Sequence, residues 1–178
     1  MNQVSSKKIV LNGLMIALVF VVTRFSTIST PVGYFNLGDV AIMIAAVLLG
    51  GKSGFAAGSI GSALADLSAG YGIFAPVTFV IKGLEGYIVG RIAHSEGENR
   101  RSEVYRIAAV IAGSIIMIAG YFIGEAYILS LFDNTFGLAA AIKDLTTTNI
   151  PQGSISAVVG YLIIAALEKA NIRKYVLS

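Results

Sequence analysis

Cysteine and tryptophan are absent from the 178 residues, and histidine occurs once, at His94. Without Cys, a disulfide framework, a Cys-based zinc site and a thiol nucleophile are excluded. A single His also excludes a metal site built from several imidazoles. We therefore expect neither a metal site nor a cofactor. An enzyme is the weakest hypothesis, because the sequence offers no catalytic residues that can be assigned.

Charge is scarce as well, since only 13% of the residues are Asp, Glu, Lys or Arg, against a usual share of about 25%. Hydrophobic residues make up 56% of the chain, and the mean hydropathy is +0.79. This composition excludes a disordered chain, a nucleic-acid-binding tail and an ordinary soluble domain. It predicts an integral membrane protein that crosses the bilayer several times.

Long apolar runs predict an all-α membrane domain with six transmembrane helices in one domain, residues 1–178. A helix crosses the bilayer with roughly 17 to 25 mainly apolar residues. The predicted spans are residues 9–24, 38–50, 53–67, 74–90, 105–131 and 149–167. The second and third spans are short, and a tight turn at Gly50-Gly51-Lys52 joins them.

Lys and Arg are distributed unevenly between the two predicted sides of the membrane. Six spans place both chain ends on one side, together with ten of the 13 basic residues: Lys7, Lys8, Lys52, Arg91, Arg100, Arg101, Arg106, Lys169, Arg173 and Lys174. The opposite side receives Arg24 and Lys143, and Lys82 falls inside the fourth span. Cytoplasmic loops carry the excess of Lys and Arg, so we predict that both termini are cytoplasmic.

Gly51-Lys52-Ser53 has the ending of a phosphate-binding P-loop. That motif also requires a Gly where this chain has Ala46, and a strand before the loop. We interpret the segment as a cytoplasmic turn. The chain is therefore expected to have no ATPase of its own.

Small residues recur at four-residue spacing, which lets another helix approach closely in a bilayer. The third span carries two such rows, Gly54–Gly58–Ser62 and Ala57–Gly61–Ala65, for which we expect internal packing. The first span carries Gly13 and Ala17, where an external partner is nearly as plausible as internal packing.

Placing an ionisable side chain inside a membrane costs free energy, so each such residue is expected to have a structural or functional role. Lys82 and Glu85 are three residues apart and are expected to pair on one helix face, with a binding or coupling role as the alternative. Glu125 is expected near the outer surface, either solvated or as a ligand contact. Asp39 is expected to cap the second helix, and Asp66 to lie at the outer end of the third.

Aromatic and amide side chains gather where the outer loops are predicted, and they would suit a pocket for a small, flat, polar ring. Aromatic residues near a membrane interface also serve as mere anchors. The candidate ligand contacts in this region are Asn36, Tyr71, Glu125, Asn149 and Gln152.

Several short motifs, in this order and over nearly the whole chain, resemble the substrate-binding S components of energy-coupling factor (ECF) vitamin transporters. They are Gly13-x-x-x-Ala17, Pro31-x-Gly33, Leu37-Gly38-Asp39, Leu49-Gly50-Gly51-Lys52-Ser53-Gly54, Lys82-Gly83-Leu84-Glu85-Gly86 and Asn149-x-x-Gln152-Gly153. The resemblance implies a prokaryotic plasma-membrane subunit that binds a vitamin from outside. It also implies a long first loop that acts as a lid.

The resemblance further implies docking, through a small-residue face of the first helix, on a membrane coupling subunit (EcfT-type) with two ATPase subunits (EcfA-type). Gly13 and Ala17 would form that face, although the family pattern has Ala at the first position. ATP hydrolysis would then topple the S component and deliver the ligand. Lys82 and Glu85 join the five candidate ligand contacts. Within the family, the chain most resembles the members that take hydroxymethylpyrimidine or pyridoxine-type compounds, and the members that take riboflavin come next.

Two other classes of function stay open on the residues alone. An autonomous proton-coupled carrier could use Lys82, Glu85 and Glu125 as a relay. A membrane scaffold without a ligand is the other alternative.

Overall fold

The computed structural model describes residues 6–95 and 102–172, and within these ranges helices form six long segments. Two of the segments are compound, because α-helical stretches continue into short turns of other helix types. The segments are α1 Ser6–Phe25, α2 Gly38–Leu49, α3 Gly51–Ala69, α4 Ala75–Ala93, α5 Glu103–Ile123 with η1 Gly124–Ile128 and η2 Leu129–Leu131, and α6 Leu138–Asp144 with η3 Leu145–Asn149 and α7 Ile150–Lys169.

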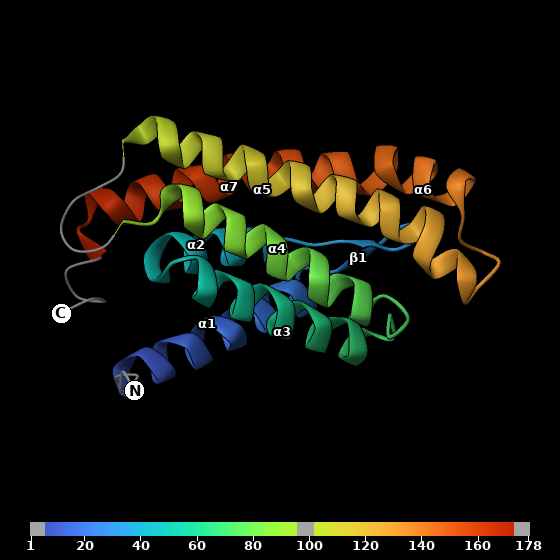
Figure 1. Ribbon diagram of the computed structural model, residues 1–178, viewed down its shortest axis with the longest axis horizontal. Coiled ribbons are helices and arrows are strands. Elements are labelled where there is room, and N and C mark those ends of the chain that lie inside the picture. The colour runs from blue at the N-terminus through green and yellow to red at the C-terminus, as the bar shows by residue number, and fades with distance from the viewer. Residues whose placement is uncertain (1–5, 96–101, 173–178) are drawn as a thin grey trace.

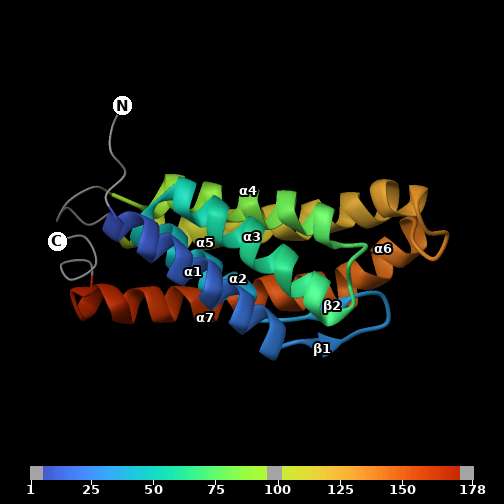
Figure 2. The same cartoon turned by 90° about the horizontal axis from the view of Figure 1, so that it is seen from below.

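The six segments alternate in direction along one elongated bundle (Figure 1). The start of α1, the end of α4, the start of α5 and the end of α7 lie at one end of the bundle, here called the terminal end. The opposite end, here called the cavity end, carries the loops after α1, α3 and η2 (Figure 1, Figure 2). The loop after α1 forms a two-stranded antiparallel hairpin, β1 Ile28–Ser29 with β2 Tyr34–Phe35, which the sequence did not predict.

Helix α2 is central and packs against α1, α3, α4 and α7. Ten of its 12 residues are buried. A helix that is apolar all round belongs in the interior of a protein. The short second span therefore follows from its position, because neighbouring helices enclose it.

Glycines bring α3 and α4 into direct backbone contact. A Cβ on Gly54 would overlap the Gly86 carbonyl oxygen, and a Cβ on Gly58 would overlap that of Lys82. On the other row of α3, a Cβ on Gly61 would lie 2.8 Å from the Ile16 carbonyl oxygen of α1. The prediction that both rows serve internal packing is thus confirmed.

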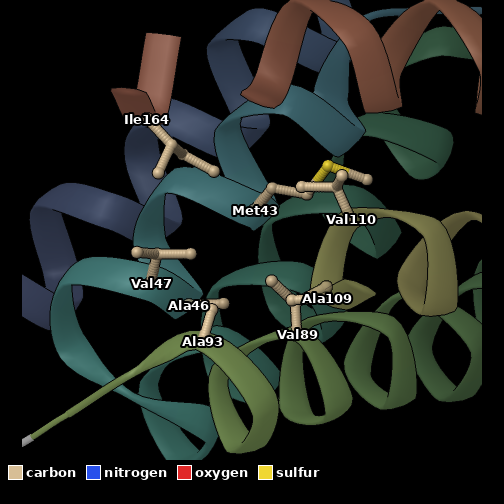
Figure 3. Packing of buried hydrophobic residues seen from close by; sticks show 8 residues of the cluster. All are labelled: Met43, Ala46, Val47, Val89, Ala93, Ala109, Val110 and Ile164. Atoms are coloured by element: carbon tan, nitrogen blue, oxygen red, sulfur yellow. The ribbon is translucent and has the colours of Figure 1, made fainter. Parts of the chain in front are cut away.

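The largest apolar cluster joins α2, α4, α5 and α7 toward the terminal end (Figure 3). Its buried members are Met43, Ala46, Val47, Val89, Ala93, Ala109, Val110 and Ile164. Met43 and Ile164 are 0% and 2% exposed.

The last segment is longer than the predicted span of residues 149–167. Residues 138–148, which we had placed outside the span, belong with Asn149 to α6 and η3, and the helix then continues into α7. The Thr146 and Thr147 hydroxyls donate to main-chain carbonyls of the preceding turn, at 3.2 Å to Ile142 and 2.9 Å to Lys143. Such bonds let polar residues remain inside a helix.

Among the described residues, three helical segments are long and apolar enough to cross a membrane: Ser6–Phe25, Glu103–Leu131 and Leu138–Lys169. The predicted turn at Gly50 is present, with a positive φ of 89°. Of the residues used for orientation, Arg100, Arg101, Arg173 and Lys174 lie outside the described ranges. The number of crossings and the cytoplasmic position of the termini stay predictions.

Candidate functional site

A cavity opens at the cavity end, between the hairpin and the ends of α3, α4, α5 and the last segment. Its empty volume is about 340 Å³, counting the part open to solvent, and only about 20 Å³ of it admits the centre of a water molecule. The cavity is therefore narrow as it stands. Its lining residues are Gly33, Tyr34, Asn36, Asp66, Phe74, Thr78, Tyr121, Glu125, Asp144, Asn149 and Gln152.

Gln152 connects the hairpin loop to α7 and α2. Its side-chain oxygen accepts hydrogen bonds from the main-chain N–H of Asn36, at 2.8 Å, and from the Asn36 amide, at 3.3 Å. Its amide nitrogen donates to Asp39 Oδ2 at 2.9 Å. These partners lie more than 110 residues apart in sequence. The bonds fix how the loop closes one wall of the cavity.

A buried charged cluster lies just below the cavity floor. Lys82 pairs with Asp39, and its ammonium nitrogen lies 3.4 Å from Glu85 Oε2. The three residues are at most 2% exposed. The ammonium also lies 5.4 Å from the centre of the Tyr121 ring, which lines the cavity. The cluster thus links the floor of the cavity to α2.

The structure corrects one expectation about charged residues and excludes one of two alternatives for another. Asp39 does not cap α2, because its carboxylate is taken up by Lys82 and Gln152, while the Asn36 side chain accepts from the Gly38 N–H at 2.8 Å. Glu125 is not solvated, since it is 1% exposed and faces the cavity. The expected pairing of Lys82 with Glu85 is confirmed.

Aromatic rings form the side of the cavity nearest the loops. The Tyr34 and Tyr71 ring centres are 4.6 Å apart, and those of Phe74 and Phe136 are 5.3 Å apart. The Tyr34 hydroxyl donates to Asp66 at the end of α3. Burial, followed by the nearby Asp66 carboxylate, raises the pKa of the Tyr34 phenol, so this hydroxyl remains a donor at neutral pH.

The structure brings four of the seven predicted ligand residues together around the cavity: Asn36, Glu125, Asn149 and Gln152. Lys82 and Glu85 lie in the buried cluster beneath them. Tyr71 packs behind the lining against Tyr34, and its hydroxyl donates to Ser29 at 3.1 Å. A ligand role for any of these residues stays a prediction.

Sequence reasoning missed Thr78 and Asp144 in the lining. The hydroxyl groups of Thr78 and Tyr121 are hydrogen-bonded to each other at 3.0 Å. The Asp144 carboxylate accepts a hydrogen bond from the Asn149 amide at 3.1 Å. No signal in the sequence indicated this pair, because residues 138–148 lay between two predicted spans and residues five apart do not face each other on a regular α-helix. The wider helical turn of η3 separates the two residues here.

Gly13 and Ala17 lie on the outward face of α1, away from the cavity. No atom outside the helix lies within 4 Å of a Cβ placed on Gly13. Large apolar side chains flank them on the same exposed surface, with Leu14 58% and Leu18 38% exposed. Neither residue takes part in internal packing within the described chain.

Comparison with known proteins gives one family over nearly the whole chain. Residues 3–169 match the family model described as ECF-type riboflavin transporter, S component. A protein of Pyrococcus woesei, named as an uncharacterized protein in the gap 3' region, is 44% identical over 97 residues, which are 54% of this chain and 62% of that protein. The match thus spans less than two thirds of that relative.

Two further relatives align along almost their full length. The thiamine precursor transporter HmpT of Lactococcus lactis subsp. cremoris is 26% identical over 97% of this chain and 94% of its own. A UPF0397 protein of Lactobacillus helveticus is 27% identical over 97% of this chain and 95% of its own.

Proposed function

This chain belongs to the family of S components of ECF-type riboflavin transporters, and we propose that it binds a small vitamin or vitamin precursor of the hydroxymethylpyrimidine or pyridoxine type. The family makes it a membrane transporter subunit and not an enzyme. The resemblance noted in its sequence motifs is therefore confirmed. The ligand and its mode of delivery are our proposal.

The narrow polar cavity is the observation that carries this choice of ligand. It combines carboxylate and amide groups with aromatic rings around a small space, and such a lining suits a small, flat, polar ring. A single ring with polar substituents requires less widening of this space than a larger ligand does. A relative named as a thiamine precursor transporter, similar along the whole chain, supports the same class.

Riboflavin is the second candidate, because the family model carries that name. A three-ring flavin with a ribityl chain would need a much larger displacement of the hairpin and of the aromatic side chains. The absence of Trp also removes one stacking surface for a flavin. We rank riboflavin after the single-ring compounds for these two reasons.

For delivery, we propose that the outward face of α1 docks on a membrane coupling subunit of EcfT type, which in turn carries two EcfA-type ATPases. Gly13 and Ala17 leave this face flat, which permits close approach of another helix. In this scheme the chain has no ATPase, and its termini are cytoplasmic in a prokaryotic plasma membrane. ATP hydrolysis by the coupling module topples the docked chain and releases the ligand inward.

Uptake into proteoliposomes tests this function against an autonomous proton-coupled carrier. The purified chain is reconstituted alone or with the coupling subunit and both ATPases, and radiolabelled hydroxymethylpyrimidine is supplied outside. We expect ligand accumulation only in the complete complex with ATP, and insensitivity to dissipation of the proton gradient. Accumulation by the chain alone, collapsing with the gradient, would contradict the proposal.

A further inference from the structure

Glu125 is a buried carboxyl group whose polar neighbours include Asp144 and Asn149. It is 1% exposed, and neither of its side-chain oxygens has a well-formed hydrogen bond. It lies in η1 and lines the cavity. A buried polar group that is poorly hydrogen-bonded costs free energy, and a donor on a ligand in the cavity would remove that cost.

Two more carboxyl groups present free oxygens to the same cavity. Asp144 Oδ1 and Asp66 Oδ2 have no bonded partner, and their residues are 3% and 1% exposed. Asp144 lies close enough to Glu125 for the two groups to interact electrostatically. Two neighbouring carboxyl groups are not both ionised without mutual repulsion. A positively charged ligand would allow both groups to be ionised.

Each amide and hydroxyl group of the lining already forms at least one hydrogen bond within the protein. The Asn149 amide donates to Asp144, the Gln152 amide to Asp39, the Asn36 amide to Gln152 and the Tyr34 hydroxyl to Asp66. The remaining two hydroxyls, of Thr78 and Tyr121, bond each other. No Lys, Arg or His occurs among the described residues that line the cavity. The described lining thus contains three carboxyl groups and no basic side chain.

From this imbalance we propose that the cavity binds its ring as a cation, with Glu125 and Asp144 accepting hydrogen bonds from two separate N–H groups of the ligand. This inference rests on the proposed function and specifies its ligand chemistry. A protonated aminopyrimidine supplies both groups, one on the ring nitrogen and one on the exocyclic amine. The Glu125 carboxylate balances the added charge, as in other charge-assisted hydrogen bonds.

The same chemistry sets what the cavity rejects. A phosphate ester of the same pyrimidine would bring negative charge toward three carboxyl groups. The deaminated pyrimidinone would lose one donor and the cationic form, leaving one carboxylate unpaired. A site that loses a hydrogen-bonding partner discriminates strongly, because its buried polar group is left unsatisfied.

Calorimetric titration of the full chain in detergent tests this proposal with three probes: aminohydroxymethylpyrimidine, its deaminated pyrimidinone analogue and its phosphate ester. The protein is wild type, Glu125→Gln, Asp144→Asn or Asp133→Asn. Asp133 is the matched control, because its carboxylate accepts from the Thr135 N–H at 2.8 Å in a loop and does not line the cavity. Thermal unfolding of each ligand-free variant is measured in parallel.

We expect Glu125→Gln and Asp144→Asn each to weaken aminopyrimidine binding by about 10- to 100-fold, the range for a hydrogen bond to a charged group. The ligand-free melting temperature of Glu125→Gln should be equal to or above that of the wild type, because a like-charge repulsion is removed. A carboxylate with a purely structural role would instead lower it. Asp133→Asn should change neither quantity.

The possible failures separate the inference from the function on which it rests. Unchanged aminopyrimidine affinity in both Glu125→Gln and Asp144→Asn would overturn the inference and leave the vitamin-binding function standing. Equal affinity for the pyrimidinone or the phosphate ester would do the same. Folded wild-type protein that binds no vitamin at all would contradict the proposed function itself.

Discussion

Replacing Lys82 with Met should strongly destabilise the protein, because this lysine is the cation of the buried cluster. Its ammonium contacts Asp39 and lies 3.4 Å from Glu85, and all three residues are enclosed by protein. Met has nearly the same length and fills the same space. The substitution therefore removes the charge while leaving the packing around α4 almost unchanged.

The expected cost follows from the two carboxylates that are left behind. Breaking a buried ion pair by removing one partner costs about 3–5 kcal/mol, since an uncompensated charge remains. For a chain of this length, each kcal/mol shifts the melting temperature by roughly 2–4 °C. We thus expect Lys82→Met to melt about 6–20 °C below the wild type.

A double variant separates the charge effect from any loss of packing. Asp39→Asn together with Lys82→Met removes both main partners, and the two sites should couple by about 1.5–3 kcal/mol. Lys143→Met is the matched control, because Lys143 is exposed and is expected to tolerate the change.

Circular dichroism during heating suits the assay, since the chain contains no Trp for intrinsic fluorescence and no Cys for thiol dyes. The reasoning would be refuted if Lys82→Met melted within about 2 °C of the wild type. Additive losses in the double variant would refute the coupling of Lys82 to Asp39.

Three further predictions concern the packing, the lid and the docking face. Gly58→Ala should lose about 1–3 kcal/mol of stability by overpacking α3 against α4. Gly13→Ala, with open space around its Cβ, should not lower the melting temperature. Equal losses of stability in the two variants would contradict the contact of Gly58 with α4. Gln152→Ala should weaken ligand binding by about 1–3 kcal/mol, because both the ligand and the Asn36 loop lose a hydrogen-bond partner. An unchanged dissociation constant for the ligand would remove Gln152 from the site. Ala17→Trp should abolish co-purification with the coupling subunit and leave ligand affinity intact. The exposed control Val158→Trp on α7 should change neither co-purification nor ligand affinity; wild-type recovery of the complex with Ala17→Trp would exclude this face.

Local patterns in the sequence were enough to predict the apolar helices and their close contacts. The four-residue rows on α3 indicated internal packing because each Gly on one face leaves room for a neighbouring backbone, and the contact of Gly58 with α4 confirms it. Lys82 and Glu85 were found as a pair because their spacing places them on one helix face, at an observed 3.4 Å.

Contacts between distant parts of the chain were beyond this reasoning. Asp39 looked like a helix cap, yet its carboxylate bonds Lys82, 43 residues away, and Gln152, 113 residues away. Asp144 was missed because its segment looked like a loop, whose polar Thr hydroxyls in fact bond the helix backbone. The lining of the cavity depends on such long-range pairs, and a single sequence does not reveal them.

The most direct test of the account is a calorimetric titration of the detergent-purified chain, without partners, against hydroxymethylpyrimidine, pyridoxine, riboflavin, thiamine, pantothenate and folate. The account predicts tight one-to-one binding of a single-ring compound by the chain alone. Absence of binding by protein shown to be folded, or tightest binding of an anionic compound such as pantothenate or folate, would contradict it.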